Sequence, residues 1–253
     1  MPASSSNLAS ATIHAVRVEH LNKEYYLGTQ KVVALKDVSV LVRQGDFLAI
    51  SGPSGSGKST LLNMIGCIDT PDSGSIYIGH TEVTTLSHNE LADLRARQIG
   101  FIFQTFNLLP VLTAAENVDY PLLNRRISRK ARKERVDYYL DLVGLAKFAK
   151  HRPNEMSGGQ RQRVAIARAL AIDPRIVLAD EPTANLDHKT GLGILNLMTE
   201  INQQQGTTFI FSTHDAQVMA MANRVVRLAD GEIIDAGYKF SEQGTTATDV
   251  APP

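Results

Sequence analysis

Two segments in the N-terminal part of the chain alternate between apolar and polar side chains. Val16 and Val18 mark the first segment, and Val38, Val40 and Val42 mark the second. A period of two is the pattern of a strand that buries one face, because successive side chains point to opposite sides of a sheet. We therefore expect an antiparallel β layer in this part of the chain.

Short apolar runs follow, and they alternate with longer helical patterns. The runs are rich in β-branched or aromatic residues and cover residues 47–50, 100–103, 176–179 and 208–212. Such runs are typical of parallel strands that are buried on both faces. Residues 225–228 and 232–234 flank Asp230 and Gly231, which predicts a hairpin with a two-residue turn.

Between residues 104 and 153 the pattern is helical. Ser128 is a candidate N-cap, and the apolar stripe that follows it consists of Ala131, Val136, Leu140 and Val143. The whole pattern predicts an α/β fold with an antiparallel β subdomain and an α-helical subdomain inserted over about residues 105–165.

The composition fits one such domain over residues 13–238. The chain has 253 residues, of which 43% are hydrophobic, so it can build a sizeable core. Residues 1–12 and 239–253 contain few apolar side chains, and we expect them to be disordered tails. No run of 18 apolar residues occurs and the first residues lack the order of a signal peptide, so we expect a soluble protein that is not exported.

Charge and cysteine content narrow the classes of partner. Lys plus Arg and Asp plus Glu both number 26, so no global field attracts nucleic acid or an anionic membrane. The single cysteine, Cys67, excludes an internal disulfide and fits a reducing cytosol. Because Cys67 lies in a helical apolar pattern, we expect a small core residue rather than a reactive thiol.

A glycine-rich motif directly follows the apolar run at residues 47–50. Its residues fit the pattern G-x-x-x-x-G-K-[ST] and are Gly52, Pro53, Ser54, Gly55, Ser56, Gly57, Lys58 and Ser59. Backbone N–H groups of such a loop and the N-terminus of the helix after it cradle phosphates. Lys58 is expected to reach the β- and γ-phosphates, Ser59 to ligate Mg²⁺, and the adjacent Thr60 to belong to the phosphate site. The motif predicts binding of a nucleoside triphosphate.

Two neighbouring carboxylates end the apolar run at residues 176–179. Asp180 is a candidate for holding Mg²⁺, and Glu181 is placed to activate an attacking water. The alternative is that Asp180 caps a helix and Glu181 is merely solvated. The phosphate-binding loop favours the catalytic interpretation.

A second anion-binding element precedes a strong helical pattern. Ser157, Gly158, Gly159 and Gln160 follow Met156 and resemble the signature motif of the ATP-binding-cassette (ABC) ATPases, with Met in place of the usual Leu. In that family the signature of one subunit closes on the γ-phosphate held by the other subunit. The resemblance covers about residues 13–236 and implies the ABC ATPase fold, ATP as substrate and Mg²⁺ as cofactor.

Other positions match the family in order. Gln104 resembles the Q-loop glutamine that senses the metal, Asp187 lies in a segment like the D-loop, and His214 resembles the switch histidine. Tyr25 resembles the aromatic residue that stacks on adenine, and Tyr26 could take this role instead. Local phrases around Cys67, Glu116 and Asp180 resemble the branch that serves lipoprotein release and macrolide export.

The resemblance implies partners and a location. We expect a dimer with a second ABC subunit, either another copy or a paralogue, that drives separate transmembrane subunits at the cytoplasmic face of a bacterial inner membrane. Contact with the membrane itself is expected to be indirect. The apolar residues Phe106, Leu108, Leu109 and Leu112 belong either to the core or to the interface with that partner.

Two other functional classes remain open at this point. A soluble ABC ATPase of nucleic-acid maintenance or translation usually carries a coiled coil, zinc-binding cysteines or two cassettes. A small-molecule kinase would have no use for the Ser157 motif. The basic segment at residues 125–135 invites a nucleic-acid reading, but most such runs are solvated helix faces and no aromatic residue interleaves with it, so we expect no nucleic acid.

Overall fold

The structure, a computed structural model, describes residues 14–238 and contains two sheets. The four-stranded sheet is antiparallel and has the order β2-β1-β4-β5. Its strands are β1 (His14–Leu27), β2 (Gln30–Arg43), β4 (Ser73–Ile78) and β5 (Thr81–Glu82). Val16 pairs with Val42 and Val18 with Val40, so the two alternating segments form the predicted antiparallel layer.

The six-stranded sheet has the order β10-β9-β3-β8-β7-β6. Its strands are β3 (Phe47–Ser51), β6 (Ile99–Ile102), β7 (Ile176–Asp180), β8 (Thr208–Thr213), β9 (Arg224–Ala229) and β10 (Glu232–Tyr238). All neighbours are parallel except β9 and β10, which form the predicted hairpin around Asp230 and Gly231. Both turn residues have positive φ, at 48° and 80°, as a tight hairpin turn requires.

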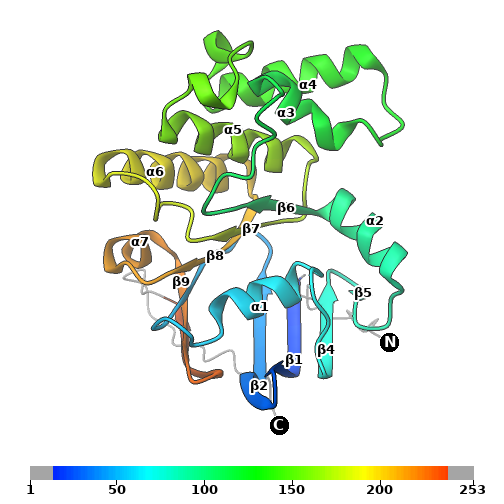
Figure 1. Cartoon of the computed structure of the whole chain (residues 1–253), viewed down its shortest axis with the longest axis vertical. Coiled ribbons are helices and arrows are strands. Elements are labelled where there is room, and N and C mark those ends of the chain that lie inside the picture. The colour runs from blue at the N-terminus through cyan, green and yellow to red at the C-terminus, as the bar shows by residue number, and fades with distance from the viewer. Residues whose placement is uncertain (1–13, 239–253) are drawn as a thin grey trace, which may run out of the picture.

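Helices cover this sheet and form a separate group at one end of the molecule (Figure 1). The α-helices are α1 (Lys58–Ile65), α2 (His88–Gln98), α3 (Ala114–Asp119), α4 (Arg129–Leu142), α5 (Gly158–Ala171), α6 (His188–Gln205) and α7 (Ala216–Met221). Three short 3₁₀ helices are η1 (Tyr120–Leu122), η2 (Ala146–Phe148) and η3 (Pro153–Glu155). The segment from α3 to α5 forms this separate group (Figure 1), and the predicted end of the insertion at about residue 165 falls within α5, which continues to Ala171. Strands β1, β2 and β4 lie at the opposite end (Figure 1).

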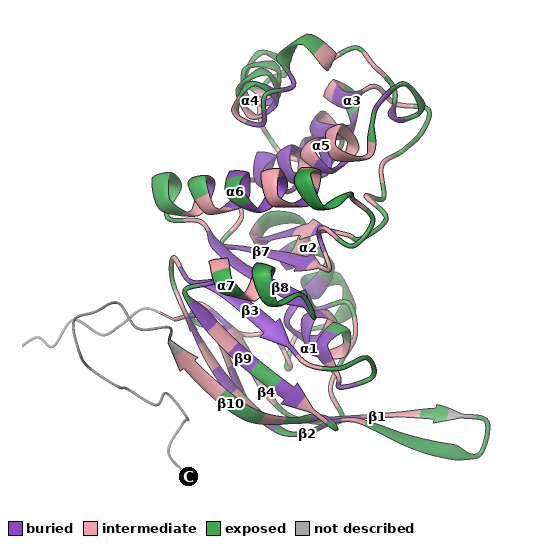
Figure 2. Cartoon of the chain, turned by 90° about the vertical axis from the view of Figure 1, so that its left-hand side faces the viewer, coloured by how far each residue is buried: buried purple, intermediate pink, exposed green. Residues whose placement is uncertain are grey.

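The alternation of side chains along the parallel strands divides the core in two. Phe47, Phe209 and Phe211 pack with the helices of the insertion and with α6. Leu48 and Ile210, on the other face, pack with α1 and the antiparallel sheet. Buried residues accordingly follow the central sheet, whereas the outer end of the β1–β2 hairpin is exposed (Figure 2). The six-stranded sheet is thus a rigid support between two hydrophobic layers.

The predicted stripe on α4 is correct except at its first position. Ser128 caps the helix by accepting a hydrogen bond from the Ala131 N–H, and Val136 and Leu140 are buried. Ala131 itself is exposed, because it lies on the outer face of the first turn. Among residues 14–238, no helix is long and apolar enough to cross a membrane. The two expected tails lie outside the described residues.

Candidate functional site

Three neighbouring parallel strands end at one edge of the central sheet. Ser51 pairs with Thr213 at the ends of β3 and β8, and Asp180 pairs with Ser212 where β7 meets β8. Chain segments that leave the carboxyl ends of adjacent parallel strands meet in space. The glycine-rich loop after β3, Asp180 and Glu181 at the end of β7, and His214 after β8 are therefore brought together.

Two glycines of the loop occupy positions where no other residue fits. Gly52 has φ 153°, and a Cβ added there would lie 2.2 Å from the backbone oxygen of Leu228. Gly57 has φ 102°, and its Cβ would lie 2.5 Å from the oxygen of Ala34. The loop thus folds tightly onto its neighbours and turns directly into α1. The first N–H groups of an α-helix have no partner within the helix and are available to bind an anion.

Lys58, the first residue of α1, is buried under this loop. Its ammonium donates hydrogen bonds to the oxygens of Gly52 at 2.9 Å and Pro53 at 2.8 Å. The Oγ of Ser56 is buried and has no hydrogen-bond partner among the described residues. A cluster of donors around a turn of backbone N–H groups is suited to a phosphate group.

Asp180 holds two hydroxyl groups rather than a helix end. Its Oδ1 accepts hydrogen bonds from Ser59 at 3.2 Å and from Ser212 at 2.5 Å. The helix that follows along the chain, α6, is capped by Asp187 instead. The alternative in which Asp180 is an N-cap is therefore wrong. Hydroxyl and carboxylate oxygens lying this close together are the donor set that Mg²⁺ prefers.

Glu181 and His214 form a pair beside Asp180. The Nδ1 of His214 lies 3.0 Å from Oε1 of Glu181, with the histidine exposed and the carboxylate partly buried. Glu181 has φ 43°, an uncommon conformation for a residue with a side chain, and its N–H donates to the Oγ of Ser212 at 2.9 Å. This backbone turn directs the Glu181 side chain out of the strand and towards His214.

A cavity of about 670 Å³ unites most of these groups. The site residues on its walls are Tyr25, Ser54, Gly55, Gly57, Lys58, Ser59, Thr60, Glu181 and His214. Val32, Val33 and Ala34 of β2 also line it. Tyr26 does not line the cavity, since it lies on the other side of β1 and is 69% exposed. Of the two candidate aromatic residues, only Tyr25 reaches the space next to the loop.

The signature residues lie outside this cavity, at the start of α5. The Oγ of Ser157 accepts from the Gln160 N–H at 3.3 Å, and the Gln160 Oε1 accepts from the Ser157 N–H at 2.8 Å. This reciprocal capping box begins the helix, and Met156 before it is buried as a core residue. Gly158 packs near Leu186, and Gly159 near Thr190, so the motif is seated against the start of α6.

Gln104 and Asp187 are not joined to the cavity within this chain. The carbonyl of Gln104 accepts a hydrogen bond from the Asn185 side chain at 3.0 Å, while the glutamine itself is exposed. Asp187 caps α6 by accepting from the Thr190 N–H at 3.0 Å, and hydrogen bonding to the Thr190 side chain and N–H lowers the pKa of Asp187. A helix-capping role for Asp187 can be inferred from its position before the α6 pattern, but our sequence reasoning missed it. It also missed Ser212, whose only signal is its place two residues before His214.

The other candidates have structural surroundings. Cys67 is buried, and burial raises the pKa of its thiol to about 11, as expected of an inert core residue. Leu108 packs against the core and Leu109 is exposed, while the ring of Phe106 lies 5.0 Å from the Arg161 guanidinium. In the basic segment, Arg132 pairs with Asp119 at 3.0 Å.

A phosphate-binding loop, a strand-end pair of carboxylates and a facing histidine define a P-loop nucleoside triphosphatase. The family model for ABC transporters matches residues 35–184. The chain belongs to the ABC transporter family of ATP-binding proteins and is an ATP hydrolase, which confirms the family and fold class predicted from the sequence.

Individual relatives agree with this assignment. The uncharacterized ABC transporter ATP-binding protein MJ0796 of Methanocaldococcus jannaschii is 45% identical over 222 residues, which are 86% of this chain and 94% of that protein. The macrolide export ATP-binding/permease protein MacB of Mannheimia succiniciproducens is 45% identical over 92% of this chain, but this match spans only 36% of MacB.

A solved structure gives the same result for the fold. The dimeric, post-hydrolysis state of the MJ0796 cassette bound to ADP and Pi has a TM-score of 0.81 and 44% identity, covering 88% of this chain and 98% of that one. The fold of this chain is therefore that of an ABC ATPase cassette.

Proposed function

We propose that the cavity holds ATP with its base against Tyr25 and its phosphates against the glycine-rich loop. The observation that carries this proposal is the cavity itself, which joins an aromatic side chain, the start of α1 and the Glu181–His214 pair in one space. The phosphates would be surrounded by the glycine-rich loop and the start of α1, which supply Gly52, Pro53, Ser54, Gly55, Ser56, Gly57, Lys58, Ser59 and Thr60. Lys58, whose ammonium bonds two loop carbonyls, would exchange them for phosphate oxygens.

Ser59 and Asp180 are the residues of this chain that would hold Mg²⁺. Their oxygens already lie 3.2 Å apart, and residues 14–238 contain no cluster of three or more His, Cys, Asp or Glu side chains that would bind a metal elsewhere. When bound, the ion neutralises charge on the phosphate oxygens. A role for Gln104 in holding it stays a prediction.

Glu181 is the proposed general base. Its carboxylate lines the cavity, where it can orient a water and accept its proton as the γ-phosphate is attacked. His214, 3.0 Å away, fixes the position of that carboxylate. Ser212 supports both acids, because its hydroxyl donates to Asp180 and accepts from the Glu181 N–H.

We further propose that the site is completed across a dimer. The cavity of this chain is not lined by Ser157, Gly158, Gly159, Gln160 or Asp187. The N-terminus of a helix such as α5 is nevertheless suited to bind a γ-phosphate. The cassette of MJ0796, which is similar to this chain, has been solved as a dimer. In this arrangement the start of α5 of each subunit faces the loop of the other.

Mixing two inactive variants tests the shared site. Lys58→Ala removes the phosphate cradle and Ser157→Arg blocks the signature, so each variant alone should be nearly inactive. In an equal mixture half of the dimers are mixed and carry one intact site of two, so about a quarter of the wild-type rate should return. If mixed dimers form and the rate stays at the level of the parents, independent composite sites are excluded.

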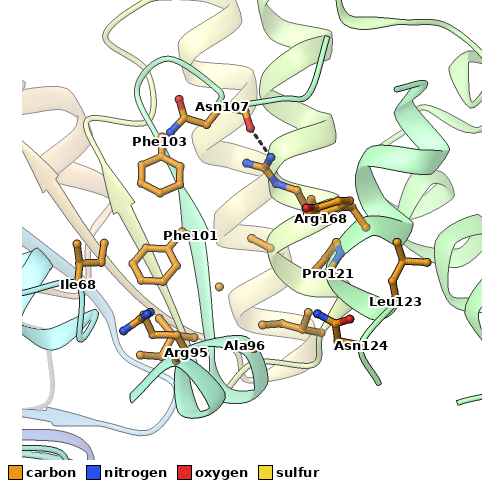
Figure 3. A pocket seen from close by; sticks show the side chains of 16 residues that line it. Ile68, Arg95, Ala96, Phe101, Phe103, Asn107, Pro121, Leu123, Asn124 and Arg168 are labelled. Carbon is orange, nitrogen blue, oxygen red and sulfur yellow. Dashed lines mark hydrogen bonds between the residues drawn. The ribbon is translucent and has the colours of Figure 1, made fainter. Parts of the chain in front are cut away.

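A groove beside the Q-loop is the proposed docking site for transmembrane subunits. It has a volume of about 660 Å³ and lies between α2, β6, η1 and α5. Phe101 and Phe103 form one wall, with rings stacked 5.7 Å apart, and Pro121 and Leu123 form the other (Figure 3). Phe106, Leu108, Leu109 and Leu112, the candidates from the sequence, do not line this groove.

The floor of the groove is connected to the signature helix. Arg168 of α5 donates a hydrogen bond to the carbonyl of Asn107 (Figure 3) and a second one, at 3.0 Å, to the carbonyl of Phe106. Both loop residues have positive φ, at 47° and 64°, so the Q-loop is held in a conformation that Arg168 helps to maintain. A helical segment of a membrane subunit that docks in this groove would directly contact residues that surround Arg168, such as Asn107.

A matched pair of surface variants tests the groove. Leu123→Asp changes an exposed apolar residue of the groove, and Ile234→Asp changes one on β10, outside it; the two are 50% and 66% exposed. Leu123→Asp should abolish co-purification with the membrane subunit, whereas Ile234→Asp should not. Equal loss in both variants would contradict docking at this groove.

The similarity to MacB and the local sequence phrases support a role in envelope export or release, at the cytoplasmic face of the inner membrane. On this proposal the membrane subunits select the transported substrate, because the cavity of this chain is built for ATP alone.

A further inference from the structure

The ring of Tyr25 is anchored from outside the nucleotide cavity. Its hydroxyl donates a hydrogen bond to Oδ2 of Asp69 at 2.9 Å. Asp69 lies in the turn after α1 and does not line the cavity. The aromatic residue on β1 is therefore connected to the far end of the helix that begins at the phosphate-binding loop.

Asp69 is itself held by further donors. Its Oδ1 accepts from the Thr70 N–H at 2.7 Å and lies 3.4 Å from the ammonium of Lys23, which also donates to the Thr70 carbonyl at 2.7 Å. The Lys23 side chain is only 11% exposed. Because this lysine is buried and pairs with a carboxylate, it stabilises the turn at Asp69 and Thr70 and is not a freely solvated surface residue.

Lys23 also contacts the aromatic ring. Its ammonium lies over the ring of Tyr25, 5.1 Å from the centroid. Tyr25 lines the cavity, whereas Lys23 does not, so the ammonium contacts the ring from outside the cavity lining. A cation over an aromatic ring is attracted by its π-electrons, so Lys23 restrains the tilt of the ring as well as its hydroxyl end.

The protonation states suit this arrangement. Burial and the hydrogen bond to Asp69 raise the pKa of Tyr25, so its hydroxyl keeps the proton that it donates. Burial acts to raise the pKa of Asp69, but the hydrogen bonds from Thr70 and Tyr25 and the charge of Lys23 lower it overall.

We propose that Asp69, supported by Lys23, is a positioning residue that sets the Tyr25 ring for the base of ATP. The proposal rests on the base-stacking role of Tyr25 proposed above. Helix α1 starts at Lys58 in the phosphate site and has eight residues, about 12 Å, and Asp69 follows it closely. One short helix thereby sets the distance between the phosphate cradle and the base platform.

Binding of ATP and of inorganic triphosphate, measured by calorimetry without Mg²⁺, tests this proposal. Asp69→Ala and Tyr25→Phe remove the same hydrogen bond from opposite sides. Each should weaken ATP binding about 3- to 10-fold and leave triphosphate binding unchanged, because triphosphate has no base. The variant that carries both substitutions should bind ATP no more weakly than Asp69→Ala alone, since both substitutions remove the hydrogen bond between Tyr25 and Asp69.

Two further variants separate the possible failures. Glu24→Ala is the control. It removes the 2.8 Å ion pair between Glu24 of β1 and Lys31 of β2, and it should change the affinity for neither ATP nor triphosphate. If Tyr25→Ala leaves ATP binding unchanged, base stacking itself is wrong. If Tyr25→Ala weakens ATP binding while Tyr25→Phe does not, stacking stands and the positioning role of Asp69 is overturned.

An equal loss of ATP and triphosphate binding in Asp69→Ala would also overturn the proposal, because Asp69 would then support the fold of α1 rather than the ring. Should Asp69→Ala fail to fold, Tyr25→Phe decides the question alone, since it deletes the hydrogen bond and leaves the carboxylate in place.

Discussion

The chain has two regions suited to anions, and they differ in how complete they are. The loop from Gly52 to Ser59 encloses a cavity whose walls also supply Glu181 and His214. The start of α5 has no such enclosure, and the side chains of Ser157 and Gln160 each accept a hydrogen bond from the backbone N–H of the other residue in a capping box. The first region is enclosed within one chain, whereas the second is an open surface that, on the dimer proposed above, would become a site only against the other subunit.

Because of this difference, we expect nucleotide binding and ATP hydrolysis to depend on different regions of the chain. Nucleotide affinity should depend on the loop region of the same subunit, and hydrolysis should depend on both regions. A variant in the loop region should thus weaken nucleotide binding in the isolated subunit, while a variant at the start of α5 should leave nucleotide binding there unchanged and affect hydrolysis once a dimer forms.

Glu181→Gln should have the largest effect. Loss of a general base typically slows a reaction 10²- to 10⁴-fold, about 3–5 kcal/mol of barrier, while ATP binding should persist because the loop is unchanged. Steady-state hydrolysis and equilibrium binding measure the two quantities. Glu200→Gln, an exposed change on α6, is the control. A turnover within about threefold of wild type would move the role of base to another residue, His214 first.

A pair of glycine variants should separate the regions. Gly52→Ala places a Cβ 2.2 Å from a backbone oxygen and should lose ATP binding in the isolated subunit. Gly158→Ala places a Cβ 3.2 Å from the flexible end of Leu186 and 4.0 Å from the ring of Phe106, so folding and ATP binding should be preserved. Its dimer should nevertheless hydrolyse ATP about 10- to 100-fold more slowly. If Gly158→Ala weakened binding in the monomer, the two regions would not be independent.

Ser157→Ala should have the smallest effect on the isolated chain. Loss of an N-cap side chain typically costs about 1 kcal/mol, because an N–H at the start of the helix loses its acceptor. Urea unfolding of the subunit measures this cost, and Ser128→Ala on α4 provides a second cap for comparison. A loss of several kcal/mol would mean that the capping box also supports the contact with α6.

Much of this site could be predicted because its chemistry is local in sequence. The glycine pattern before Lys58, the Asp180–Glu181 pair and His214 each end a recognisable strand, and parallel strands bring their ends together. The positive φ of Glu181, which directs its side chain out of the strand, has no signal in the sequence.

The remainder depends on contacts between distant segments. Asp69 and Tyr25 are 44 positions apart, and the docking groove combines Phe101, Leu123 and Arg168 from three elements. No periodicity or short motif reports such contacts. The Q-loop apolar residues illustrate the limit, since their pattern fitted either core or interface and the groove is formed by their neighbours instead.

Arg168 gives helix α5 the properties of a lever. It holds two carbonyls of the Q-loop and lies ten residues after Gly158, the first residue of the helix, a distance of about 15 Å. A tilt of about 10° around Arg168 would therefore move the start of α5 by about 3 Å, roughly the length of one hydrogen bond. A small displacement at the groove is enough, by geometry alone, to make or break a contact at the far end of the helix.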